Sequence, residues 1–66
     1  MDPTICHYEM VEAMVDDNLS VAKERAISLK EWLDKGGYPP IGYRRKTIED
    51  YILFVFRKTQ SLGELQ

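Results

Sequence analysis

The segment from Leu19 to Pro40 limits the possible folds most, because it joins an amphipathic pattern to an abrupt stop. Its apolar side chains recur at alternating spacings of three and four residues, which place them on one helix face: Leu19, Ala22, Ala26, Leu29 and Leu33. Gly36 follows this pattern, and glycine readily takes the left-handed conformation that closes a helix. The two prolines behind it push the residues that precede them into extended backbone. We therefore predict a helix over residues 19–35 and a stiff connector over residues 36–46.

The N-terminal segment predicts another helix, over residues 3–15. Asp2 suits the N-cap position and Pro3 suits the first helical position. An apolar arc that includes His7 is expected to face the core with these side chains: Tyr8, Val11, Met14 and Val15. Only residues 16–18 separate this helix from the next one. So short a link makes the two helices an antiparallel hairpin.

Residues 48–62 predict a third helix. Thr47 begins a pattern that resembles a capping box, and Gly63 follows as a stop. The run Tyr51–Phe56 is β-branched and aromatic enough to form a buried strand instead, but no other segment would pair with it. A helix here would present a core face with these side chains: Ile48, Tyr51, Ile52, Val55 and Leu62, extended by Phe56.

The connector is long enough to run back along the hairpin. Its eleven residues reach at most about 36 Å, whereas a helix over residues 19–35 is about 25 Å long. We expect Tyr38, Ile41 and Tyr43 to pin the connector to the core. The predicted fold is all-α, with one small domain over residues 1–66: an antiparallel helical hairpin, a proline-containing crossover and a third helix across the hairpin.

The small size of the chain predicts association. A domain of 66 residues buries only about 60% of its unfolded surface, and its core rarely supplies more than about 3–5 kcal/mol. Leu53 and Phe54 do not fit on the core face of the third helix, and Ile27 lies on the polar side of the second. We expect these side chains to form a protein interface, first in a homodimer or larger homo-oligomer and then with another protein.

Charge is unevenly distributed along the chain, although the net charge is only −2. Residues 1–22 contain five acidic side chains and no Lys or Arg. Residues 35–58 contain six basic side chains against two acidic ones. Such opposite halves can attract each other within a fold or between copies. The alternative is two solvated faces whose charges contribute little to stability.

Three features predict a cytoplasmic protein. The single cysteine, Cys6, excludes an intrachain disulfide and fits a reducing compartment. The N-terminal residues lack the basic region of a signal peptide. The longest apolar run, Tyr51–Phe56, is far shorter than the roughly 20 residues that a membrane span needs. We therefore expect no membrane segment.

Catalytic chemistry has little support, and we predict a non-enzymatic protein without a cofactor. His7 directly follows Cys6, and neighbours on a helix point about 100° apart, so the two cannot form a nucleophile–base pair. A soft-metal site is the alternative, because His7, Met10 and Met14 share one arc and their groups bind copper(I). Methionine on an apolar face more often fills a core, so we expect no bound metal.

A basic cluster of Arg44, Arg45 and Lys46 directly precedes the third helix. These residues supply the alternative function, a small nucleic-acid-binding regulator that uses them as phosphate contacts. Glu49 and Asp50 follow closely and would repel phosphates. We therefore favour a protein-interaction module, which would act as a self-associating subunit, an adaptor or an inhibitor.

The ten residues EWLDKGGYPP, Glu31–Pro40, resemble a motif in short uncharacterised proteins of phages and environmental bacteria. The resemblance covers the end of the second helix and the start of the connector. It implies no activity, cofactor or partner, because those proteins have no assigned activity. The sequence therefore predicts an architecture and leaves the partner and the pathway open.

Overall fold

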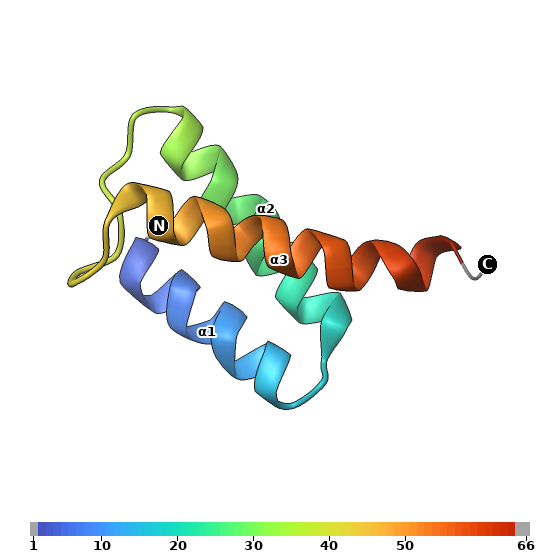
Figure 1. The fold of residues 1–66 in the computed structure, drawn as a ribbon. Helices are drawn as coiled ribbons and strands as arrows, with labels where there is room; N and C mark the ends of the chain where they lie inside the picture. The colour runs from blue at the N-terminus through green and yellow to red at the C-terminus, as the bar shows by residue number, and fades with distance from the viewer. Residues whose placement is uncertain (1, 65–66) are drawn as a thin grey trace.

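The computed structural model describes the backbone of residues 2–64 and the side chains of residues 2–60. This part of the chain forms three helices and no strand: α1 (Pro3–Val15), α2 (Leu19–Asp34) and α3 (Arg45–Glu64). α1 and α2 form the hairpin, and α3 packs on α2 and lies across the hairpin (Figure 1). The predicted all-α fold, with helix rather than strand at residues 51–56, is therefore confirmed.

Local hydrogen bonds set both ends of α1. The Asp2 carboxylate accepts a hydrogen bond from the backbone N–H of Thr4 at 2.9 Å, as an N-cap does. At the other end, Asp17 takes the left-handed conformation with φ of 60°, which aspartate tolerates better than most residues. The N–H of Asn18 then reaches back to the carbonyl of Ala13 at 2.8 Å. This reversal turns the chain directly into α2.

The face of α2 that packs in the core is the predicted one, with Ala22, Ala26, Leu29 and Leu33 all buried. The face predicted for α1 is wrong. Its buried side chains are Pro3, Cys6, Met10 and Ala13, while Tyr8 and Val15 are exposed. The reason is steric: the two alanines of α2 allow a close helix approach, which the small Cys6 and Ala13 of α1 suit, while the flexible Met10 fills the space between them. Val11 and Met14 lie on the flank of α1 and are half-buried.

α3 begins three residues earlier than predicted, so Arg45 and Lys46 belong to the helix and not to the connector. The Arg45 guanidinium donates to the carbonyl of Leu33 at the end of α2, at 3.0 Å, and to the Glu49 carboxylate at 3.1 Å. These bonds tie the start of α3 to the end of α2. The capping pattern predicted at Thr47 therefore lies inside the helix, which also continues beyond the predicted end through Gly63 to Glu64.

The core face of α3 carries Ile48, Ile52 and Val55, all buried as predicted, with Tyr51 and Phe56 packed partly against the core. Thr59 is also buried, and its hydroxyl donates to the carbonyl of Val55 at 3.0 Å. This hydrogen bond satisfies the buried Thr59 hydroxyl, whose burial the apolar pattern did not predict. The side chain of Leu62 lies outside the described residues.

The connector is attached differently from the prediction. Tyr38, Ile41 and Tyr43 are exposed, and Pro40 is the side chain that is buried. Two hydrogen bonds also attach the connector: the Trp32 indole N–H donates to the Tyr38 carbonyl at 2.8 Å, and the Ile41 N–H donates to the Thr4 hydroxyl at 3.1 Å. Two aromatic contacts also hold the segment, because the Tyr43 ring centroid lies 4.6 Å from that of His7 and the Tyr38 ring centroid lies 5.5 Å from that of Trp32. Both tyrosines nevertheless keep an exposed side.

Candidate functional site

The three side chains predicted to form an interface are all exposed, but they do not form one patch. Ile27 is 42% exposed, Leu53 50% and Phe54 44%. Leu53 lines an open groove of about 270 Å³ between α2 and α3, which also contains Lys30 and Asp34. Ile27 lines a separate groove of about 300 Å³ farther along the same two helices. Contact between these residues and a partner remains a prediction.

Phe54 lies on the other flank of α3, which faces α1. Its ring centroid is 5.7 Å from that of Tyr51, and Tyr51 lies 6.3 Å from His7 of α1. The ammonium of Lys58 is 5.7 Å from the centre of the Phe54 ring, within range of a cation–π contact. Leu53 and Phe54 thus border the outer face of α3 from opposite sides, as neighbours on a helix must.

His7 joins this aromatic row at the junction of α1, α3 and the connector. Its ring centroid is 4.6 Å from that of Tyr43, which is the shortest aromatic contact among the described side chains. Burial lowers the pKa of His7, because a partly covered imidazole loses hydration when it is charged. His7 is therefore a packing residue at this junction.

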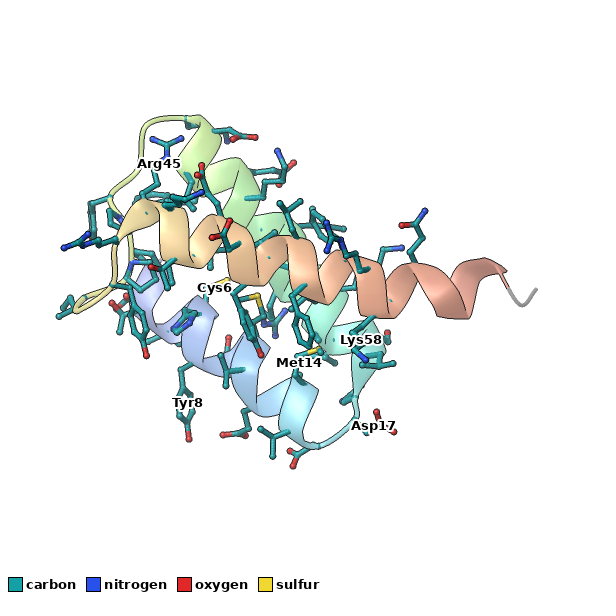
Figure 2. The ribbon with its side chains drawn as sticks, viewed as in Figure 1. Cys6, Tyr8, Met14, Asp17, Arg45 and Lys58 are labelled. Carbon is teal, nitrogen blue, oxygen red and sulfur yellow. The ribbon has the colours of Figure 1, made fainter. Side chains whose placement is uncertain are left out.

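The outer face of α1 is a surface that the sequence pattern did not indicate. Three large apolar side chains project from it, with Tyr8 65% exposed and Val15 79% exposed, and Ile5 beside them. Figure 2 shows Tyr8 pointing away from α1 and from α3. A hydrogen bond to the Glu12 carboxylate raises the pKa of Tyr8, which places these two groups side by side. The surface is therefore both apolar and acidic.

One signal in the sequence could have revealed this surface. Ala22 and Ala26 predict a close approach of α1 to α2, and α1 has one stripe with two small residues, Cys6 and Ala13, on either side of the unbranched Met10. Choosing that stripe as the core face turns Tyr8 outward. The prediction instead placed the arc with Tyr8 and Val15 in the core, so it did not identify this arc as an exposed surface.

The predicted phosphate contacts are largely occupied by acidic neighbours. Arg45 pairs with Glu49 at 3.1 Å, and the Lys46 ammonium lies 3.9 Å from the Asp50 carboxylate. Only Arg44, which is exposed, stands apart from these pairs within the described side chains. An intrahelical carboxylate beside each cation weakens its attraction for a phosphate.

The soft donor groups contact different parts of the fold. The Cys6 thiol donates to the carbonyl of Arg25 on α2 at 3.3 Å, and burial raises its pKa. Met10 is fully buried, whereas the His7 ring is half-buried and lies tilted against the Tyr43 ring. Within residues 2–60, His, Cys, Asp and Glu form no cluster of three that could hold a metal ion. In the described part of the chain, no helix has the length and hydropathy needed to cross a bilayer.

Comparison with protein-family models, with curated proteins and with solved structures gave no match. The resemblance of residues 31–40 to short phage and bacterial proteins thus stays a prediction. The surfaces of this chain are the basis for any functional assignment.

Proposed function

We propose that this chain is a small non-enzymatic protein-interaction module that associates first with further copies of itself, through the outer face of α3. The observation that supports this proposal is the exposure of Leu53 and Phe54 on one short stretch of helix. Phenylalanine is among the residues enriched in the cores of protein interfaces, and covering exposed leucine with a partner removes apolar area from water.

The size of the chain also favours association. Its accessible surface is 4707 Å², and a chain of this length has a small core that leaves it marginally stable alone. Covering apolar area gains about 25 cal/mol per Å². A second copy that covers Leu53 and Phe54 would therefore add to the free energy of unfolding.

Light scattering over a range of micromolar concentrations tests this proposal. We expect a dimer or larger species, and we expect Phe54→Glu to shift it toward monomer. Gln60→Glu is the matched control, because it adds the same charge to another exposed position of α3. A monomer at every concentration, with Phe54→Glu as stable as the parent, would contradict self-association.

A further inference from the structure

The outer face of α3 combines apolar and basic side chains. Leu53 and Phe54 are accompanied there by Arg57 and Lys58, which are both exposed. Asp50 lies one turn earlier on the same face, and its carboxylate is 3.9 Å from the Lys46 ammonium. No ion pair involves Arg57 or Lys58 among the side chains of residues 2–60. The sequence supports this asymmetry, with five basic side chains against two acidic ones from Arg44 to Lys58.

The outer face of α1 has the opposite character. Its exposed apolar side chains, Tyr8 and Val15, alternate with the exposed carboxylates of Glu12 and Asp16. α1 contains no Lys or Arg that could neutralise them. One nearby cation, Arg25 of α2, pairs with another α1 residue, the Glu9 carboxylate at 3.1 Å. Both outer faces therefore carry large exposed apolar side chains, and the charges that have no ion-pair partner among the described side chains are opposite in sign on the two faces.

A single copy cannot bring its own two faces together. α1 and α3 are fixed by their packing on the hairpin core, and Tyr8 points away from α3 in Figure 2. The geometry points to head-to-tail association, in which the apolar acidic face of α1 packs on the apolar basic face of α3 of a second copy. This contact rests on the proposed self-association and names its second surface.

Charge selects this pairing over the symmetric ones. Two α1 faces would oppose carboxylate to carboxylate, and two parallel α3 faces would oppose Arg57 and Lys58 to their own equivalents. In an antiparallel pair of α3 faces these cations would meet Glu49 and Asp50, whose carboxylates already pair with Arg45 and Lys46. Like charges placed together across an interface oppose association, whereas complementary faces attract and fix the register. A head-to-tail contact leaves one face of each kind free at the ends, so assembly continues into a ring or an open chain.

Two single substitutions test this geometry, each blocking one face with a lysine. Tyr8→Lys removes the apolar centre of the α1 face and repels the basic face of α3. Phe54→Lys removes the apolar centre of the α3 face. Each variant alone should remain monomeric at concentrations where the parent associates. An equimolar mixture should form a complex of one copy of each variant, because each supplies the face that the other lacks, and this complex should not grow further.

The control is Ser20→Lys, which adds the same charge at an exposed position of α2 outside both faces and should associate like the parent. Circular dichroism checks that each variant is folded. If either is not, Val15→Lys and Leu53→Lys replace them on the same two faces. Raising the salt concentration should weaken the parent assembly, because screening reduces attraction between exposed charges.

The outcomes separate this contact from self-association in general. If Tyr8→Lys associates like the parent, or if the mixture stays monomeric while the parent associates, head-to-tail packing is wrong and self-association survives. If the parent is monomeric throughout, both proposals fail. Recovery of a mixed complex of one copy of each variant would establish the α1–α3 contact.

Discussion

Leu29→Ala tests whether the hairpin core has the packing described above. Leu29 is 0% exposed and belongs to a cluster that contains residues of all three helices. Truncating a buried leucine costs about 2–5 kcal/mol, because the transfer free energy is lost and a cavity remains. We place this substitution in the upper half of that range, since the surrounding helices enclose the site on both sides. A core of this size supplies only about 3–5 kcal/mol, so the variant should be largely unfolded.

Urea unfolding followed by far-UV circular dichroism measures this effect at low protein concentration. The chain offers a matched control, Leu53→Ala, which is the same chemical change at a half-exposed position. We expect the control to lose much less stability than Leu29→Ala. If assembly contributes to stability, Leu29→Ala should recover helix content as its concentration rises. Equal losses for the two variants, or a loss below about 1 kcal/mol at Leu29, would refute the predicted packing.

Three further perturbations probe other parts of the fold. Gly37→Ala places a methyl group inside the Trp32 ring, and we expect thermal unfolding to show a loss of about 1–3 kcal/mol. The pKa of His7 is lowered by burial, so the unfolded chain binds the proton more readily; stability should fall as the pH drops below the ordinary value of 6.5, and His7→Leu should remove that part of the pH dependence of the melting temperature. At physiological salt, mobility-shift titration should show no nucleic-acid binding tighter than about 10⁻⁵ M; sub-micromolar binding that substitution of Arg44–Lys46 abolishes would favour the regulator instead.

Apolar periodicity correctly predicted the core face of a helix where most of its apolar side chains lie on one side. The stripe on α2 is buried from Ala22 to Leu33, with Leu19 half-buried, and Gly36 has a φ of 89°, as its place behind that stripe indicated. The core face of α3 followed for the same reason. In each case most of the apolar side chains form one arc, so one orientation buries the largest number of them.

The orientation of α1 and the path of the connector could not be predicted in this way. α1 has apolar side chains on nearly every side, so its core face depends on the shape of α2 and not on its own pattern. The connector is held by the Trp32 indole, the Thr4 hydroxyl and Pro40. Hydrogen bonds between residues distant in sequence leave no periodic signal. The exposed face of α1 was not predicted, because the pattern of α1 alone did not show which side packs in the core.

Trp32 is a natural fluorescent probe for detachment of the connector from the end of α2. It is the single tryptophan of the chain, its indole N–H is bonded to the Tyr38 carbonyl, and its ring lies edge-on to the Tyr38 ring at 5.5 Å. Its fluorescence emission therefore reports whether the connector stays on the end of α2, while circular dichroism reports the helices. A red shift at lower denaturant than the loss of helix would mean that the connector detaches first, as a unit separate from the hairpin. Coincident transitions would mean that the crossover and the three helices unfold together.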